Sequence, residues 1–115
     1  MSFALTTPQF LDGSKTVTRR LGWTRLRAGD QILAVEKCMG LKKGEKQVPL
    51  GVIEIVDVRR EALEDITADD VIREGFPDMT RAEFVTMFSS HMRVPRAIFV
   101  TRIEFRRLDE PKDAA

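Results

Sequence analysis

The sequence predicts one α+β domain, in which a β-rich body forms a small barrel or curled sheet and two helices are inserted before the last strand. The chain has 115 residues, and chains of this length rarely divide into two domains. Two long segments with strand patterning, 50–58 and 97–107, enclose two helix-start signals. A hydrophobic fraction of 43% is enough for one core and excludes wholesale disorder. We assign the domain to residues 1–108 and expect 109–115 to form a flexible tail.

The first twenty residues predict a strand, a short helix and a second extended segment. Phe3–Leu5 has the apolar character of a short buried strand. Thr7 is placed as an N-cap with Pro8 at the first helical position, which opens a helix over residues 10–11. The run Asp12-Gly13-Ser14 ends this helix, and the β-branched residues 16–18 favour an extended chain.

Two more strands are predicted in the middle of the chain. The turn at Ala28–Asp30 leads into a strand at 31–37, and residues 40–46 form a loop. The segment Leu50–Val58 is apolar on both of its faces, with Val52 and Val56 on one face and Ile53 and Ile55 on the other. A strand that is apolar on both faces is typical of the interior of a sheet, so we expect it to be central.

Two helices are predicted between this strand and the last one. Thr67 and Thr80 each begin a capping-box pattern, and Gly75 is placed to end the first helix. In the second helix Phe84, Phe88 and Met92 recur every four residues, which predicts a core-facing stripe. The last strand is predicted over residues 97–107.

The charges are unevenly distributed along the chain. Residues 1–50 carry a net charge of +5, residues 51–90 carry −6, and residues 91–115 carry +2. Such asymmetry indicates a polyanionic partner on one face, or halves that neutralise each other within the fold. Thirteen of the nineteen basic residues are arginine, which binds phosphates through its planar fork and stacks on bases.

Four short motifs occur in a fixed order. They are Gly13-Ser14-Lys15-Thr16-Val17-Thr18-Arg19-Arg20, Leu26-Arg27-Ala28-Gly29-Asp30, Glu74-Gly75-Phe76 and Ile103-Glu104-Phe105. Together they resemble the ASCH family, whose members share a PUA-like β-barrel. The resemblance implies a small PUA-like barrel with short helices and a cleft associated with RNA or modified nucleosides. The chain is similar in particular to small bacterial N4-acetylcytidine amidohydrolases.

By this resemblance Thr18 is the nucleophile, Lys15 activates it, and Glu74 completes the catalytic set, with Asp78 as the alternative carboxylate. A threonine hydroxyl needs a base to take its proton, and a lysine serves as that base only when burial or a nearby cation lowers its pKa. A carboxylate can move the proton onward or help to activate water. In an ideal strand Lys15 and Thr18 point to opposite faces, so their contact requires a turn or bulge.

A second group of residues is predicted to contact the substrate or RNA. Arginines beside the site can bind a phosphate or an oxyanion, an exposed tryptophan can stack on a base, and loop lysines can follow a phosphate backbone. The predicted contacts are Arg19, Arg20, Trp23, Arg25, Lys42 and Lys43. The alternatives are a core position for the tryptophan and a solvated charged loop for the lysines.

Composition excludes several other functions. With one histidine, His91, and one cysteine, Cys38, the sequence predicts no zinc site, and it contains no phosphate-binding loop or dinucleotide fingerprint, so no metal or cofactor is expected. No apolar run approaches the roughly 20 residues that span a membrane, and the single cysteine fits a reducing, cytoplasmic compartment. The resemblance to the ASCH family implies hydrolysis of an N4-acyl amide on cytidine. The alternatives are a non-catalytic module that binds RNA or a modified nucleotide, and a protein-interaction partner that uses the acidic middle segment.

Overall fold

Four antiparallel strands form one curled sheet in the computed structural model, which describes residues 1–36 and 43–108. Their order across the sheet is β1-β4-β3-β2. The strands are β1 (Val17–Arg20), β2 (Gln31–Val35), β3 (Pro49–Ala62) and β4 (Phe99–Arg107). The helices are the 3-10 turns η1 (Ala4–Thr6) and η2 (Leu63–Asp65) and the α-helices α1 (Thr7–Leu11), α2 (Ala68–Arg73) and α3 (Arg81–Met92). The predicted α+β class, with two α-helices before the last strand, is confirmed.

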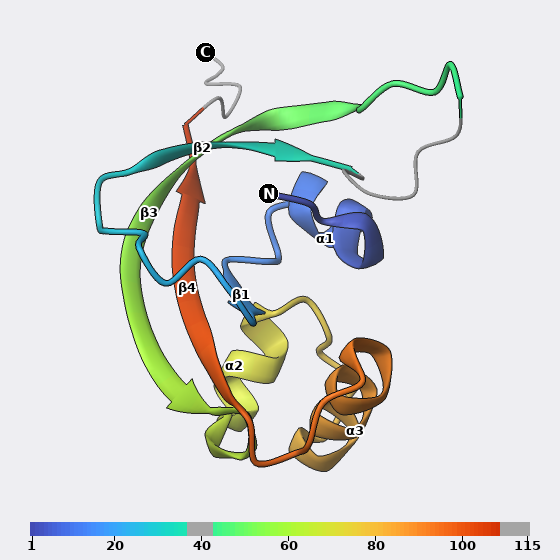
Figure 1. Ribbon diagram of the computed structural model, residues 1–115, viewed down its shortest axis with the longest axis vertical. Coiled ribbons are helices and arrows are strands. Elements are labelled where there is room, and N and C mark those ends of the chain that lie inside the picture. The colour runs from blue at the N-terminus through green and yellow to red at the C-terminus, as the bar shows by residue number, and fades with distance from the viewer. Residues whose placement is uncertain (37–42, 109–115) are drawn as a thin grey trace.

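The long strands β3 and β4 bend into an arc, and the helices lie on its inner side (Figure 1). This arrangement gives two apolar cores. The first, beside α1, is built around Phe3, Phe10, Ile53, Ile55, Ile103 and Phe105. The second, beside α2 and α3, is built around Leu63, Ile66, Val71, Phe84, Phe88 and Val100. Because the two cores are separate, the fold leaves room for polar groups between them.

The N-terminal segment differs from the prediction. Residues Ala4–Thr6 form the turn η1 rather than a strand, and Leu5 is 59% exposed. Before this turn, Ser2 forms an isolated parallel bridge with Val35, and the Phe3 amide donates a hydrogen bond to the Val35 carbonyl at 2.9 Å. The chain turns because Thr7 Oγ1 donates a hydrogen bond to the Phe3 carbonyl at 2.8 Å. The helix is present, but its N-cap is Thr6, one residue earlier than predicted.

The central position of β3 is confirmed, but its two faces are not equivalent. Ile53 and Ile55 are buried, whereas Val56 is 43% exposed. The register shifts between Ile55 and Asp57, which marks a β-bulge. A bulge interrupts the two-residue alternation, so Val58, which the alternation places on the face of Val56, packs against the same core as Ile53 and Ile55.

Both capping threonines are confirmed. Thr67 accepts a hydrogen bond from the Asp70 amide, and Thr80 forms a reciprocal capping box with Glu83. Phe84 and Phe88 are buried as predicted, but Met92 at the end of the stripe is 39% exposed. The predicted tail 109–115 lies outside the described residues.

No helix in the described part of the chain is long and apolar enough to cross a membrane. The same residues contain no group of three or more His, Cys, Asp or Glu side chains placed to hold a metal ion.

Candidate active site

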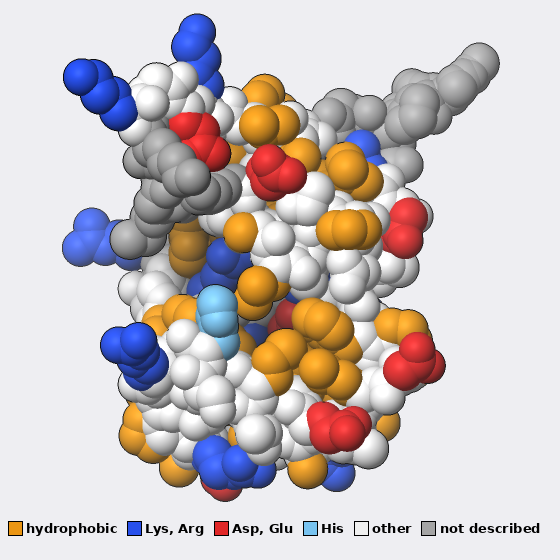
Figure 2. Space-filling model, turned by 90° about the vertical axis from the view of Figure 1, so that its right-hand side faces the viewer, with side chains coloured by type: hydrophobic (Ala, Val, Ile, Leu, Met, Phe, Trp, Pro, Cys, Tyr) orange, Lys and Arg blue, Asp and Glu red, His pale blue; other side chains and the backbone are white. Residues whose placement is uncertain are grey.

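A pocket of about 200 Å³ lies between the N-terminal segment and α3, where residues of both cores meet. Phe3 comes from the first core and Phe84 and Phe88 from the second. In the space-filling view, basic and acidic side chains are visible at the bottom of a hollow rimmed by hydrophobic ones, with His91 beside it (Figure 2). The pocket thus combines apolar walls with a charged floor.

The floor contains a buried ion pair between Lys15 and Glu74. Lys15 Nζ lies 2.7 Å from Glu74 Oε1 and also donates a hydrogen bond to the Glu74 carbonyl at 2.8 Å. Both residues are only 4% exposed. Although 59 positions separate them in the sequence, the backbone joins their segments, because the Thr16 amide donates to the Arg73 carbonyl at 2.8 Å.

Local structure explains why these two side chains meet. Gly75, with a φ of +104°, ends α2 directly after Glu74 and turns the chain away. Lys15 precedes β1, which begins at Val17, so it is free of the strand alternation that would direct it away from Thr18. Lys15 and Thr18 both line the pocket.

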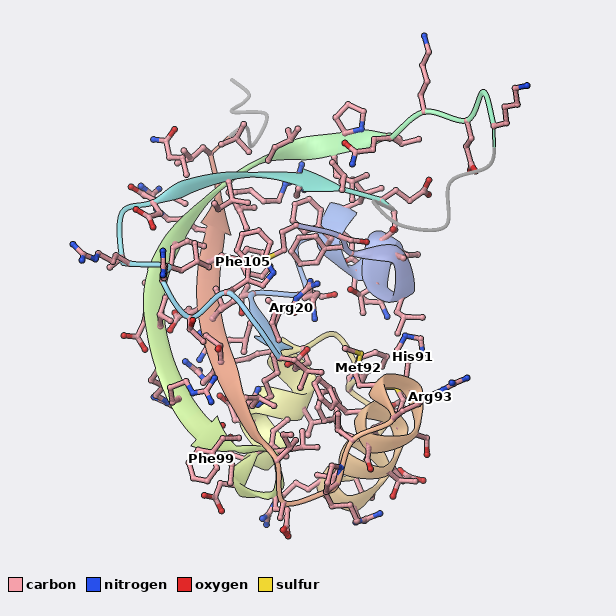
Figure 3. The ribbon with its side chains drawn as sticks, in the orientation of Figure 1. Arg20, His91, Met92, Arg93, Phe99 and Phe105 are labelled. Atoms are coloured by element: carbon pink, nitrogen blue, oxygen red, sulfur yellow. The ribbon has the colours of Figure 1, made fainter. Side chains whose placement is uncertain are left out.

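Thr18 and Arg20 lie on the same face of β1, two residues apart. Arg20 Nε donates a hydrogen bond to Thr18 Oγ1 at 3.2 Å. Its Nη2 donates to the Ser2 carbonyl at 2.7 Å, and its guanidinium lies 5.0 Å from the centre of the Phe3 ring. Arg20 projects from β1 into the region that His91 and Met92 of α3 border (Figure 3). It therefore presents a cation next to the predicted nucleophile.

Arg19 is placed differently from the predicted substrate contact. Its side chain is 0% exposed, and its Nη2 lies 2.6 Å from both Glu61 Oε2 and Asp70 Oδ2. Its Nη1 lies 3.3 Å from Glu74 Oε2. Arg19 is among the residues that line the pocket, so its role in substrate contact stays a prediction, but these three carboxylates already bind both of its terminal nitrogens.

Asp70 extends this buried network to β4. Arg102 Nε and Nη2 donate to Asp70 Oδ2 and Oδ1 at 2.7 and 3.0 Å. Burial acts to raise the pKa of Asp70, but the hydrogen bonds from Arg102 and Arg19 outweigh it and hold that pKa well below its ordinary value. Asp70 is therefore a carboxylate at neutral pH.

Burial has the opposite consequence for Lys15. It lowers the pKa of Lys15 by more than the Glu74 carboxylate raises it, and Arg20 and Arg19 lower that pKa further. A neutral lysine amine has two N–H bonds and one lone pair. Since Lys15 Nζ donates to two Glu74 oxygens, a neutral Lys15 would keep its lone pair for a proton. The pocket thus contains an amine whose pKa is lowered together with a hydroxyl group.

Of the remaining predicted contacts, Trp23, Arg25 and Lys43 are not among the residues that line the pocket. Trp23 is 40% exposed and has a φ of +64°, and Arg25 and Lys43 are exposed on loops. Lys42 and Cys38 lie outside the described residues. Asp78, the alternative carboxylate, borders a separate shallow hollow, so Glu74 is the carboxylate that joins the site.

Sequence reasoning missed three groups around the pocket. The pattern gave Asp70 only the last position of a capping box. That position usually holds glutamate, so the shorter aspartate was a signal that this side chain makes other contacts. Arg102, which strand alternation places on one face with Ile98 and Val100, was a second such signal. The stripe on α3 was assigned to the core, yet Phe88, Met92 and the neighbouring His91 also line the pocket.

Comparisons with known proteins identify the fold. No family model and no curated protein matches the sequence. A solved structure from Enterococcus faecalis, described under the family DUF984, matches with a TM-score of 0.62 and 15% identity, covering 90% of this chain and 70% of that one. An ASCH domain from Lactobacillus crispatus matches with a TM-score of 0.56 and 15% identity, over the same shares of the two chains. These likenesses concern the fold alone.

Proposed function

We propose that this chain, which has the α+β fold of an ASCH domain, hydrolyses an N-acyl amide on a modified nucleoside, with N4-acylated cytidine as the substrate. The observation that supports this most strongly is the convergence of Lys15, Thr18 and Glu74 on one pocket. A hydroxyl, a buried amine and a carboxylate are the groups that acyl transfer requires.

In the proposed reaction, neutral Lys15 takes the proton of the Thr18 hydroxyl while Thr18 Oγ1 forms a bond to the amide carbon. The electron pair of the carbonyl moves to its oxygen, and Arg20, which already donates to Thr18 Oγ1, is placed to stabilise that oxyanion. When the intermediate collapses, the C–N bond breaks and the amine of cytidine takes the proton from Lys15. Glu74 holds the Lys15 amine through both steps.

The acyl group is then an ester on Thr18. Water attacks the ester carbon, Lys15 accepts a proton of that water and returns it to Thr18 Oγ1, and the carboxylic acid leaves. Each step breaks and forms bonds among the substrate, water and these side chains, so no further reagent is needed.

The size of the pocket supports a small substrate group. Its volume of about 200 Å³ is below the roughly 300–1,000 Å³ of pockets that enclose drug-sized ligands. It therefore suits an acylated base, with the ribose and any phosphate outside the mouth. The apolar walls from Phe3, Phe84 and Phe88 favour a flat ring over a charged group.

The test is release of cytidine from N4-acetylcytidine, followed by chromatography. We expect release by the parent protein and none by Thr18→Ala or Lys15→Met, whereas Thr16→Ala, the same change at a threonine outside the pocket, should remain active. Mass spectrometry after rapid quenching should detect an acyl adduct on Thr18. Equal rates for the parent and Thr18→Ala would contradict the proposal. So would the absence of hydrolysis by the parent with acetyl and longer acyl groups, tested both on free nucleosides and in RNA.

A second candidate function is binding of RNA or a modified nucleotide without catalysis. The exposure of Trp23 and Arg25 on the segment between β1 and β2 favours it, because an aromatic ring and a guanidinium are the groups that stack on unpaired bases. This function predicts affinity that falls steeply with salt and with Trp23→Ala or Arg25→Ala. Affinity insensitive to both would exclude it.

A further inference from the structure

We propose that Arg19 is a positioning residue of the active site: by binding the second oxygen of the Glu74 carboxylate, it prevents Glu74 from acting as a full counter-ion for Lys15 and so keeps Lys15 available as a base. This inference rests on the proposed function. It assigns to Arg19 an indirect electrostatic effect on Lys15, exerted through Glu74, in place of contact with the substrate.

The Glu74 carboxylate is divided between two cations. Its Oε1 accepts from Lys15 at 2.7 Å, and its Oε2 accepts from Arg19 at 3.3 Å. A carboxylate that already pairs with a guanidinium stabilises a second cation less, since the two positive charges repel each other in a poorly solvated site. Arg19 thus weakens the one interaction that would hold a proton on Lys15.

Arg19 is itself held in a fixed position. Its Nη2 is bound by Glu61 and Asp70, each at 2.6 Å, and Arg102 fixes Asp70 from β4. The guanidinium therefore stays beside Glu74, so Lys15 is never the sole cation that contacts this carboxylate. Arg19 therefore differs from a mobile surface arginine, whose charge water would screen.

The balance of charge around Lys15 determines whether a substitution favours its protonated or its neutral form. At the centre of the network Lys15, Arg19 and Arg102 pair with Glu61, Asp70 and Glu74. At its edge, Arg59 pairs with Glu61, Arg73 lies 3.9 Å from Asp70, and Asp57 and Glu104 lie 3.9 and 3.8 Å from Arg102. Removing Arg19 leaves an excess of negative charge next to Lys15, which favours its protonated form. Removing the charge of Glu61 leaves an excess of positive charge, which favours the neutral amine.

An ion-pair network that only supports the fold makes a different prediction. In that case each substitution lowers stability and activity together, and none moves the titration of Lys15 in a direction set by charge. Two substitutions of opposite sign therefore separate the two roles.

The experiment measures the titration of Lys15 directly by NMR of protein with 13C-labelled lysine side chains. The sequence contains six lysines, and the Lys15 signal is the one missing from Lys15→Met. We expect Arg19→Met to move this titration to higher pH, Glu61→Gln to move it to lower pH, and Arg19→Lys to leave it close to the parent. In parallel, kcat/KM of Arg19→Met at pH 7 should fall about tenfold whenever the midpoint of the Lys15 titration rises by about one on the pH scale, and it should recover at higher pH.

The outcomes separate the two proposals. Titrations that are unchanged, or that move in the same direction for Arg19→Met and Glu61→Gln, would overturn the role of Arg19. If the titrations move as expected but no variant or parent protein hydrolyses an acyl amide, the proposed function fails while the tuning of Lys15 by Arg19 stands. If Arg19→Met does not fold, Glu61→Gln still tests the sign, and Arg19→Lys tests whether a positive charge at this position is enough to keep the titration of Lys15 at its parent value.

Discussion

Arg19 of β1 and Arg102 of β4 are register partners, and both donate hydrogen bonds to the carboxylate of Asp70. Like charges directly opposite each other destabilise a sheet. Asp70, carried by α2, lies between the two guanidinium groups and compensates both. The position of α2 on the sheet is thus fixed by a buried charge as well as by apolar packing, and the same charge supports the floor of the pocket.

The first prediction concerns Asp70→Asn. Asp70 is 4% exposed, and removing one member of a buried charge network typically costs about 3–5 kcal/mol because the remaining charges stay uncompensated. We expect a loss of this size in the free energy of unfolding, measured with urea at neutral pH. The matched control is Asp69→Asn, the preceding residue of the same helix turn, which is exposed and should change stability little.

The same variant tests the dependence of stability on pH. The pKa of Asp70 in the folded protein is held below its unfolded value of 3.8, so its contribution is fully present above that value and is lost as the pH falls below it. In the parent, the free energy of unfolding should therefore decrease on acidification below about pH 4. Asp70→Asn should show a shallower decrease. Equal slopes in the two proteins would contradict the lowered pKa.

The second prediction separates the site from the fold. Lys15→Met removes the two hydrogen bonds that Lys15 Nζ donates to the buried residue Glu74, and we expect a loss of about 1–3 kcal/mol in the free energy of unfolding. Adding Glu74→Gln should restore most of this stability, because the amide is neutral and can still meet Arg19. Both proteins should be inactive. A double variant that is no more stable than Lys15→Met would show that the ion pair is not coupled in this way.

The order of elements was predictable because local signals and tertiary structure agree. The capping threonines Thr67 and Thr80, and the long strands, follow from short sequence patterns. The N-terminal turn was not predictable, since apolar Phe3–Leu5 matches a strand pattern equally well. The turn depends on hydrogen bonds to the Phe3 carbonyl from the Thr6 amide and the Thr7 hydroxyl. The bulge at Val56 was missed for a similar reason, because nothing in the alternation indicates an extra residue.

The site was predictable in its residues but not in its electrostatics. The resemblance placed Lys15, Thr18 and Glu74 together, and the pocket contains all three. It could not show that Arg19 points away from solvent into three carboxylates. That depends on Asp70 and Glu61 arriving from other elements, which is a tertiary contact with no local signature.

The third prediction concerns the capping box of α3, the helix that provides one wall of the pocket. Thr80 Oγ1 accepts from the Glu83 amide at 3.1 Å, and Glu83 Oε1 accepts from the Thr80 amide at 2.8 Å. Thr80→Ala should cost about 1 kcal/mol in the free energy of unfolding. Ser90→Ala, at an exposed position inside the same helix, should cost less. A smaller loss for Thr80→Ala than for Ser90→Ala would contradict the role of the cap.

The fourth prediction concerns Gly75, which follows the proposed catalytic carboxylate in the chain. Its φ is +104°, and a Cβ there would lie 2.9 Å from the Cβ and Cγ atoms of Gln9. Backbone strain alone costs a substituted residue about 1–2 kcal/mol, and the contact with Gln9 adds to it because these atoms are close to the α1 backbone. Gly75→Ala should therefore lower stability by more than Gly29→Ala, whose φ of +95° is similar but whose surroundings are open.

The same substitution should also affect the reaction. Relief of the contact with Gln9 requires the end of α2 to move, and Glu74 moves with it, which lengthens the 2.7 Å contact to Lys15. We expect kcat of Gly75→Ala to fall more than that of Gly29→Ala when both are assayed well below their unfolding temperatures. Full kcat in Gly75→Ala, with an unchanged titration of Lys15, would show that the pair does not depend on the turn that Gly75 forms.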